Sequence, residues 1–413
     1  MVDGVPHLIG RDVDGQPDAV LADGLDSSGH SAIQPAADRV TSVERYDVVV
    51  VGVGGMGSAA MYHLARRGKR VLGLERFDLL HEQGSSHGLT RIIRLAYFEH
   101  PDYVPLLRRA YELWHELEAE TGEQLLHTTG IIEGGPEVLE GVLHSCDVHR
   151  IEHEVLTGVE VRARFPAFDL PPEMEVVHQA DGGFVVPERC IVAHVQGALE
   201  RGATLRARER VLEWSEEENG VRVRTDRGTV EAEQLVLTAG AWSDDVARLP
   251  AGSVRAVRQV LAWFQPTRPE LFTPERMPVF NLILDGDHFY GFPAYGIPGV
   301  KLGRYEREGE SGDPDAISRE PTVEDESRLR ELTRRYLPAG AGPTVALKTC
   351  LFELSPDEHF IVDRHPDTRA AVVGAGFSGH GFKFCSVVGE ILADLAIDGS
   401  TMHDIGLFRI DRF

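Results

Sequence analysis

The stretch YDVVVVGVGGMGSAAMYHLARRGKRVLGLE, residues 46–75, decides the fold. It opens with YDVVVVG (46–52), a continuous apolar run rich in valine, as is typical of a strand buried on both faces of a parallel sheet. The segment SAAMYHLARRG (58–68) carries small and apolar residues at helical spacing, and KRVLGLE (69–75) predicts a second buried strand that ends in an acid. Strand, helix and strand in this order predict a βαβ unit.

The turn between the first strand and the helix contains a glycine motif, Gly52-Val53-Gly54-Gly55-Met56-Gly57. Gly52 permits the tight turn, Gly54 lets the backbone approach a pyrophosphate, and Gly57 lets the helix pack closely on the strand. Glu75 follows the last motif glycine by 18 residues, where an acid can accept hydrogen bonds from the adenosine ribose. A bound dinucleotide without a 2′-phosphate is therefore predicted, and the motif alone leaves FAD and NAD open.

The composition excludes several classes of partner. The 413 residues hold 42 Lys plus Arg against 66 Asp plus Glu, a net charge of -24. A nucleic-acid binder needs a basic face, and docking on anionic lipid needs one too, so neither is expected. No apolar run reaches the length of about 18 residues that a membrane span requires. Lysine is rare, occurring only at Lys69, Lys301, Lys348 and Lys383.

The N-terminal sequence and the cysteine pattern bear on the expected cellular location. Residues 1–45 are rich in Asp, Gly, Ser and Pro without periodicity, which predicts a flexible extension, and they show no secretory signal pattern. Cysteines occur at four scattered positions with no CxxC pair and no histidine pair at metal spacing. Reduced thiols, a cytoplasmic location and no metal site are expected.

The segment GSSHGLTRIIRLAY (84–97) concentrates two arginines, a histidine and a tyrosine in a short span. On a helix, Arg91 and Arg94 would share a face with the vicinity of Tyr97. The segment resembles the GSxHGxTRxIRxAY pattern of the monomeric sarcosine oxidase and N-methyltryptophan oxidase family, flavoproteins that oxidise amines. The resemblance spans residues 46–413 and rests also on DGGFVVPERC (181–190), VLTAGAWSDD (236–245), HFYGFPAYGIPGVKLGRYE (288–306), LKTCLFELSPDEHFIVD (347–363) and GAGFSGHGFKFCSVVGEILADLA (374–396).

The resemblance implies an α/β fold with two interleaved domains. A Rossmann-like FAD-binding domain takes residues 46–126, 187–252 and 354–413, and an α+β substrate domain built on an antiparallel sheet takes 127–186 and 253–353. Turn signals such as ENG and DRG are expected in the antiparallel sheet of the substrate domain. The charged stretch 318–338 predicts a surface helix, and a helix is expected to begin near Cys385.

The cofactor implied by the resemblance is FAD, attached through a thioether from Cys350 to the 8α-methyl of the flavin. The other three cysteines are expected to be free and buried. Arg91 matches an arginine beside the flavin ring. Further cofactor contacts are expected at Ser85, Thr90, Val211, Gly379, Gly381 and Lys383.

The resemblance also supplies catalytic roles. Lys301 matches the lysine that promotes the reaction with oxygen, because a fixed cation stabilises the negative charge that develops on O₂. A strand lysine usually points at solvent, but this protein otherwise uses arginine for its surface cations. Arg94 and Lys383 match the pair that holds the substrate carboxylate. Histidines and tyrosines of the same region match at His87, His380, Tyr97 and Tyr290.

The implied reaction is the oxidation of a secondary amino acid, such as sarcosine or N-methyltryptophan, by hydride transfer to flavin N5. The imine then hydrolyses, and O₂ is reduced to H₂O₂ by a monomeric enzyme. Two departures from the family pattern, Phe352 for a tyrosine and Tyr305 for a histidine, make the pocket rim less polar. They favour a bulkier N-methyl amino acid or a cyclic imino acid over sarcosine. A deaminating or pipecolate- or proline-type oxidase or dehydrogenase stays open, as does a non-catalytic flavin-binding protein.

Overall fold

The predicted βαβ unit is confirmed by the computed structural model, which describes residues 43–413. It consists of β1 (Glu44–Val51), α1 (Gly55–Arg66) and β2 (Val71–Leu74), and the two strands pair in parallel. β1 begins two residues before the predicted start at Tyr46. The rest of the predicted N-terminal extension lies outside the described residues.

The βαβ unit lies inside a sheet of eight strands with the order β10-β11-β12-β1-β2-β9, and β12 also pairs with β19, which pairs with β18. Pairing is parallel among β12, β1, β2 and β9 and between β12 and β19. The added strands are β9 (Thr204–Arg206), β10 (Val211–Glu217), β11 (Gly220–Thr225), β12 (Thr229–Leu237), β18 (Ile361–Arg364) and β19 (Ala371–Ala375).

The ENG and DRG turns were expected in the substrate domain, and this prediction was wrong. They connect β10 to β11 and β11 to β12, which pair antiparallel. Because β12 continues along β1 in parallel, the two hairpins extend the parallel sheet instead of joining the second one. Turn chemistry identified the hairpins, but only the pairing of β12 assigns them to a sheet.

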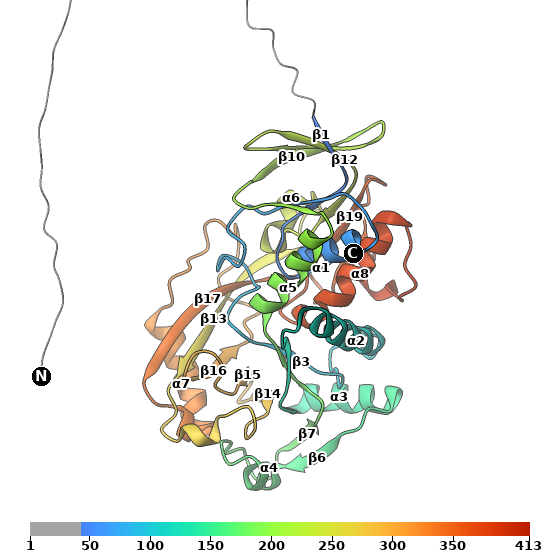
Figure 1. The fold of residues 1–413 in the computed structure, drawn as a ribbon. Coiled ribbons are helices and arrows are strands. Elements are labelled where there is room, and N and C mark those ends of the chain that lie inside the picture. Colours follow the sequence, from blue (N-terminus) through green and yellow to red (C-terminus); the bar gives the residue numbers. More distant parts are fainter. Residues whose placement is uncertain (1–42) are drawn as a thin grey trace, which may run out of the picture. The chain divides into compact units, whose positions relative to one another are not determined.

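Alternate side chains of β1 enter two different cores. Val48 and Val50 pack with residues of α1, α2 (Tyr103–Thr121), α5 (Pro187–Glu200) and α8 (Cys385–Ile397). Val49 and Val51 pack on the opposite face with residues from β2, β11 and β12. The strand is therefore buried on both faces, which explains its uninterrupted apolar sequence. Figure 1 shows α1, α5 and α8 gathered beside this sheet.

A second sheet of eight strands has the order β17-β13-β16-β15-β14-β5-β7-β6. All neighbours pair antiparallel except β14 and β5. Its strands are β5 (Ile131–Gly134), β6 (Glu154–Thr157), β7 (Glu175–Gln179), β13 (Arg255–Phe264), β14 (Val279–Leu284), β15 (Asp287–Phe292), β16 (Val300–Arg304) and β17 (Thr344–Leu354).

A small third sheet contains the arginine-rich segment. Its strands, in the order β3-β8-β4, are β3 (Arg91–Ile93), β8 (Gly183–Val185) and β4 (Leu126–Thr128). The helical arrangement considered for residues 91–97 is therefore wrong, because Arg91 to Ile93 pair with Val185 to Gly183 and the chain then leaves regular structure.

The remaining α-helices are α3 (Pro136–His149), α4 (Gly158–Arg164), α6 (Ser243–Val246) and α7 (Val323–Tyr336). The predicted surface helix is α7, which begins at a capping box of Thr322 and Asp325. Short 3₁₀ turns are η1 (Gly240–Trp242), η2 (Pro269–Leu271), η3 (Pro338–Gly340), η4 (Phe382–Phe384), η5 (Gly406–Phe408) and η6 (Ile410–Arg412). Within residues 43–413 no helix is both long and apolar enough to cross a bilayer.

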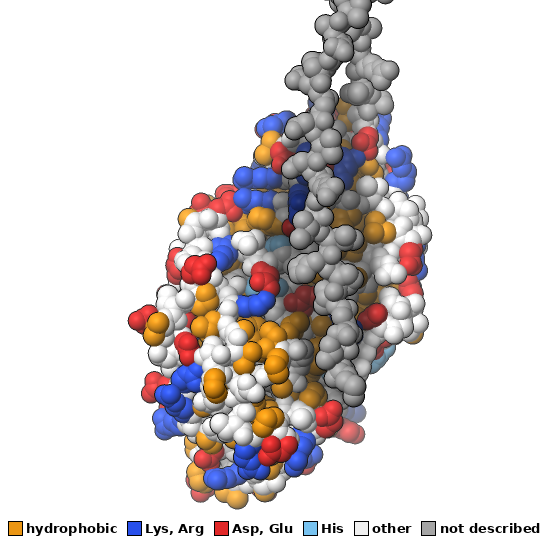
Figure 2. Space-filling model, turned by 60° about the vertical axis from the view of Figure 1, so that its left-hand side comes forward, with side chains coloured by type: hydrophobic (Ala, Val, Ile, Leu, Met, Phe, Trp, Pro, Cys, Tyr) orange, Lys and Arg blue, Asp and Glu red, His pale blue; other side chains and the backbone are white. Residues whose placement is uncertain are grey.

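The expected fold class is confirmed, with one mainly parallel sheet and one mainly antiparallel sheet in a mixed α/β arrangement. The boundaries of the two interleaved domains stay a prediction. Figure 2 shows acidic and basic side chains interspersed on the face that it presents.

Candidate functional site: two connected cavities

A first cavity of about 300 Å³ lies at the carboxyl ends of β1 and β2, beside the start of α1. The glycine motif shapes its wall. Gly52 has φ +86, and a Cβ there would lie 2.5 Å from the Thr238 carbonyl oxygen. A Cβ on Gly57 would lie 1.9 Å from the Gly52 carbonyl oxygen. Both positions therefore require glycine for the packing of strand, turn and helix.

Gly54 has a different role. A Cβ there would meet only Ser86 Oγ, at 3.5 Å, so the protein itself leaves room for a side chain. Gly54 borders the cavity, and α1 begins there without a side-chain cap. The Gly55 N–H donates to Ser86 Oγ at 3.3 Å. Open space at Gly54 and the amino end of α1 suit the close approach of a phosphate.

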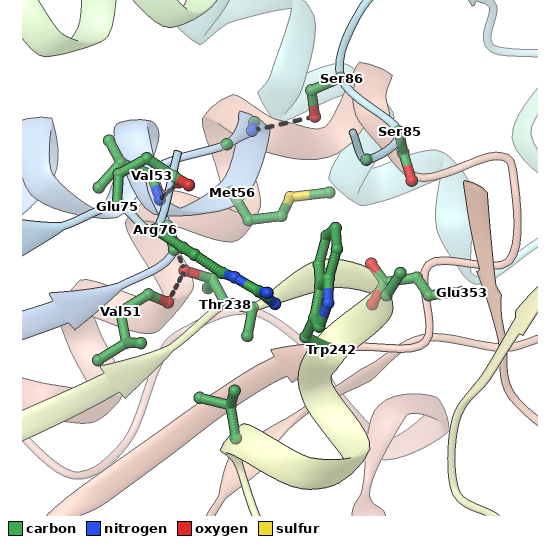
Figure 3. A pocket seen from close by; sticks show the side chains of 18 of the residues that line it. Val51, Val53, Met56, Glu75, Arg76, Ser85, Ser86, Thr238, Trp242 and Glu353 are labelled. Atoms are coloured by element: carbon green, nitrogen blue, oxygen red, sulfur yellow. Dashed lines mark hydrogen bonds between the residues drawn. The ribbon is translucent and has the colours of Figure 1, made fainter. Parts of the chain in front are cut away.

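Glu75 is held rigidly at the end of β2. Its Oε2 accepts a hydrogen bond from the Val53 N–H at 2.8 Å, and its Oε1 accepts one from the Phe77 N–H at 2.9 Å. The side chain is buried and borders the first cavity (Figure 3). The carboxylate is thus oriented by backbone groups and keeps free lone pairs for a ligand.

Two further side chains that were not predicted as site residues, Arg76 and Trp242, border the first cavity. Arg76 donates two hydrogen bonds to Asp315, both 2.9 Å long, and its guanidinium lies 5.6 Å from the centre of the Trp242 ring (Figure 3). Trp242 Nε1 also donates to Asp315, at 2.8 Å. Val211 and Ser85, predicted at the cofactor, border the same cavity.

A second cavity of about 370 Å³ lies between the third sheet, β15, β16, β17 and the 379–383 loop. The two cavities share four lining residues, which are Arg91, Phe352, Gly379 and Phe382. The two cavities therefore adjoin at these residues. We call the region of these four residues the junction.

Lys301 lies on β16, is buried and borders the second cavity. Its Nζ donates to the Gly88 carbonyl at 2.7 Å, the Thr90 carbonyl at 2.8 Å and Thr90 Oγ1 at 3.0 Å. Burial, and next the nearby Arg91, hold the pKa of Lys301 well below its ordinary value. The alternative of a solvent-facing lysine is excluded.

Arg91 belongs to the junction, and Cys350 borders the second cavity next to it. The Arg91 guanidinium donates to the carbonyls of Thr90, at 2.8 Å, and Ser85. Cys350 is buried and borders the second cavity, and burial raises the pKa of its thiol while Arg91 and Lys301 act in the opposite direction. These two cations favour the thiolate, the form that reacts with electrophiles.

Arg94 is clamped between two carboxylates. Its Nη2 donates to both oxygens of Glu99, at 2.9 and 2.7 Å, and its Nε lies 2.8 Å from Glu133 Oε1. Burial raises the pKa of Glu133 to about 7, and the attraction of Arg94 only partly opposes it. Neither acid was predicted. Glu99 stands five residues from Arg94, whereas Glu133 comes from β5 and carried no local signal.

Lys383 lies close to the same cluster, in η4. Its Nζ donates to the His380 carbonyl at 2.6 Å and lies 5.1 Å from the centre of the Tyr97 ring. Burial, and next the positive charge of Arg94, lower the pKa of Lys383 to about 7. Lys383 and Arg94 both border the second cavity, so the structure brings together the two predicted carboxylate-binding cations.

The other predicted side chains are divided between the cavities and the core. Thr90, Tyr290 and His380 border the second cavity, and Gly381 borders the first. Tyr97 is fully buried behind His380, with its hydroxyl 2.6 Å from His380 Nδ1, and lines neither cavity. His87 also lines neither cavity. Burial lowers its pKa to about 3, and both of its ring nitrogens lack a hydrogen-bond partner among the described residues.

An aromatic and amide wall completes the second cavity. Tyr305 lies 5.6 Å from Phe352 and 5.4 Å from His288, measured between ring centres. The Tyr305 hydroxyl donates to the Ser378 carbonyl at 3.1 Å, and His288 Nε2 lies 2.5 Å from Asn281 Oδ1. The sequence indicated the two rim departures, Phe352 and Tyr305, but neither His288 nor Asn281.

The residues present fit FAD. A glycine cradle with open space at Gly54 and an oriented acid at Glu75 suit an adenosine diphosphate group. The junction then leads to a cavity with buried cations, large enough to receive a ring system and a small substrate.

Comparison with known proteins agrees with this geometry. A family model described as FAD dependent oxidoreductase matches residues 47–395. Monomeric sarcosine oxidase from Streptomyces avermitilis is 42% identical over 371 residues, which are 88% of this chain and 96% of that protein. N-methyl-L-tryptophan oxidase from Yersinia pestis is 34% identical over 375 residues, 89% of this chain and 99% of that protein. The solved structure of NikD, an amino acid oxidase of nikkomycin biosynthesis, has a TM-score of 0.78 at 32% identity and covers 89% of this chain and 97% of its own.

Proposed function

The chain belongs to the family of FAD-dependent oxidoreductases that contains monomeric sarcosine oxidase and N-methyl-L-tryptophan oxidase, and on that premise we propose that it oxidises a secondary amino acid with oxygen. The observation that carries the proposal is the pair of buried cations, Arg94 and Lys383, in a cavity that adjoins the dinucleotide site. Bound FAD supplies the acceptor for a hydride from the carbon next to the amine nitrogen and passes the electrons to O₂.

The proposed substrate is an anionic amino acid bound through its carboxylate. Arg94 and protonated Lys383 hold this group by charge-assisted hydrogen bonds, each worth about 1.5–3 kcal/mol. Glu99 and Glu133 fix the guanidinium in place, but as carboxylates they also compete with the substrate for it. A proton on Glu133 therefore favours substrate binding.

Lys301 is the proposed site of oxygen activation. Its three hydrogen bonds to oxygen atoms of Gly88 and Thr90 fix the ammonium group next to Arg91 and Cys350. A cation that is already in place stabilises negative charge developing on O₂ without reorganisation.

Attachment of FAD to Cys350 is part of the proposal. The thiol lies beside the junction, and although burial raises its pKa, Arg91 and Lys301 act in the opposite direction. Acid-precipitated protein is expected to stay yellow, and Cys350→Ala is expected to release its flavin under acid. A colourless wild-type pellet with free flavin in the supernatant would refute the attachment.

The residues at the rim of the second cavity favour a substrate less polar than sarcosine. Phe352 and Tyr305 pack against each other at the cavity, and the Tyr305 hydroxyl is already engaged with the Ser378 carbonyl. We therefore expect a bulkier N-methyl amino acid or a cyclic imino acid to be preferred. The interleaved domain boundaries, a monomeric state and a cytoplasmic location complete the proposal.

An anaerobic bleaching screen tests the substrate class. Purified protein is mixed under nitrogen with sarcosine, N-methyltryptophan, pipecolate, proline and ordinary amino acids, and loss of the visible absorption band of oxidised flavin is followed. The proposal expects bleaching by secondary amino acids, most rapidly by the bulkier ones. Bleaching by primary amino acids alone would favour a deaminating oxidase, and absence of peroxide on readmission of air would favour a dehydrogenase.

A further inference from the structure

Glu353 is a buried acid that neither the glycine motif nor the family resemblance indicated. It lies on β17, three residues after Cys350, and is 7% exposed. Its Oε2 has no hydrogen-bond partner among residues 43–413. The side chain borders the first cavity, and Figure 3 shows its carboxyl group directed to the side where Trp242 stands. A buried carboxyl oxygen without a partner needs an explanation, and a ligand in the cavity provides one.

Glu353 follows the junction residue Phe352 on β17, and strand alternation puts its side chain on the opposite face from those of Cys350 and Phe352. Cys350 borders the second cavity, Phe352 borders both cavities, and Glu353 borders the first. The Glu353 carbonyl accepts a hydrogen bond from the Ser378 N–H at 2.9 Å, which sets the residue beside the loop that carries Gly379. Glu353 is thus near the flavin end expected for FAD, whereas Glu75 marks the adenosine end.

The surroundings of Glu353 favour its neutral form. Burial raises the pKa of Glu353 to about 8, although the N–H groups of Gly376 and Phe377 oppose this. Cations on neighbouring elements are engaged elsewhere. Arg258 of β13 pairs with Asp325 at 2.8 Å, and Lys383 donates to the His380 carbonyl. A carboxylic acid that keeps its proton at neutral pH is a hydrogen-bond donor as well as an acceptor.

We propose that Glu353 is a cofactor-binding residue which, as a neutral carboxylic acid, donates a hydrogen bond to the flavin ring of bound FAD at the junction. The inference rests on FAD as the cofactor and is independent of the substrate. The flavin ring carries carbonyl oxygens and ring nitrogens that accept hydrogen bonds, and reduction makes these acceptors richer in electrons.

The first test compares the binding of FAD and ADP, because ADP lacks the flavin. Variants are made in a Cys350→Ala background so that the cofactor exchanges freely, and dissociation constants are measured by equilibrium dialysis. Glu353→Leu is expected to weaken FAD binding about tenfold, which is the loss of one hydrogen bond, and to leave ADP binding within about twofold. Glu353→Gln keeps an N–H donor and is expected to stay close to its parent.

Glu213→Leu is the matched control. Glu213 borders the same cavity from β10, but it is exposed and pairs with Arg224 at 2.6 Å. This variant should leave the ratio of the FAD and ADP dissociation constants unchanged. Equal FAD affinity in Glu353→Leu and its parent, or an equal loss for FAD and ADP, overturns the proposal. If Glu353→Leu does not fold, the test rests on Glu353→Gln. Because glutamine has nearly the same shape and keeps a donor, a changed ratio of the FAD and ADP dissociation constants in this variant contradicts the assigned role.

The flavin reduction potential gives a second readout in the protein with Cys350 intact. A donor to the flavin ring stabilises its electron-rich reduced form, so Glu353→Leu is expected to have a more negative midpoint potential than the wild type. Glu353→Gln should stay near the wild-type value. Identical potentials in all three proteins would place the acid out of reach of the ring and overturn the proposal, without affecting the proposed substrate.

Discussion

The two cavities are built in different ways. In the first cavity the glycine motif and Glu75 come from one continuous segment, residues 46–75, and Glu75 is held by backbone contacts from the Val53 and Phe77 N–H groups. The second is assembled from side chains of distant segments, so that Arg94 after β3 meets Glu133 of β5 and Lys383 of η4. Local chain geometry therefore determines the glycine-motif end of the first cavity, and the balance of buried charges determines the second cavity.

The charge balance sharpens the contrast. The chain as a whole carries a net charge of -24, yet the second cavity gathers Arg91, Arg94, Lys301 and Lys383. Two of the four lysines of the sequence are buried there. Buried charges are costly unless they are paired, and here Glu99 and Glu133 supply the pairs for Arg94.

The largest effect is expected from Gly57→Ala in the first cavity. The new Cβ would overlap the Gly52 carbonyl oxygen, 1.9 Å away, so α1 must move off β1. We expect this variant to lose its bound flavin and to melt at a lower temperature than the wild type. Gly54→Ala is the control that separates the two, because it meets only Ser86 Oγ and should keep the fold while losing flavin. A yellow Gly57→Ala protein that melts like the wild type would contradict the backbone origin of this cavity.

The next largest effect is expected from Lys301→Met in the second cavity. Removing one preorganised charge that stabilises a developing anion typically costs about 10²–10³ in rate. Flavin reduction by substrate should stay nearly unchanged, and reoxidation by O₂ should slow by this factor in stopped-flow measurements. Lys348→Met is the matched control, since Lys348 is partly exposed and pairs with Glu82. Equal reoxidation rates in Lys301→Met and the wild type would remove Lys301 from oxygen activation.

A smaller effect is expected from Lys383→Met on carboxylate binding. The pKa of Lys383 is lowered to about 7, so the ammonium is present below pH 7 and is lost above it. Affinity for a carboxylate should therefore fall as pH rises through 7. The probe is a thioether analogue of the substrate, which has no amine to titrate. Lys383→Met should weaken binding at pH 6 by about 10- to 100-fold and leave only the shallower pH dependence that comes from the proton on Glu133. An unaltered profile would count against Lys383.

The smallest effect is expected from Glu133→Gln on stability. Folding raises the pKa of Glu133 from 4.5 to about 7, so the folded state retains a proton that the unfolded chain releases. This group's contribution to stability is full below pH 4.5 and is lost as pH rises to 7. The melting temperature of the wild type should thus fall relative to that of Glu133→Gln across this window, by on the order of a few degrees. Glu137→Gln, at an exposed acid, should follow the wild type.

The sequence predicted the glycine-motif end of the first cavity well, because the sequence signals for this part of the fold are local. The run of valines, the spacing of Gly52 and Gly57 and the position of Glu75 each impose a backbone geometry within 30 residues. The same reasoning failed where a tertiary contact intervened. Residues 91–93 form a strand because they pair with β8, and the turns at 218–220 and 226–228 belong to the parallel sheet because β12 pairs with β1.

Two buried acids, Glu133 and Glu353, show the limit most clearly. Glu133 and Glu353 stand in sequence contexts that read as ordinary strand residues, and their burial is visible only once β5 and β17 are packed. Their raised pKa values come from this burial, which no spacing along the chain reveals.

The sequence by itself determined the βαβ unit, the dinucleotide cradle and, through its motifs, the family. Those features depend on φ angles, strand periodicity and glycine spacing, which neighbouring residues fix. Only the tertiary structure decided that the cradle opens into a second cavity, that Arg94 is held between two acids, and that Glu353 lies beside the junction. The physical reason is that desolvation and charge pairing depend on which distant segments pack together.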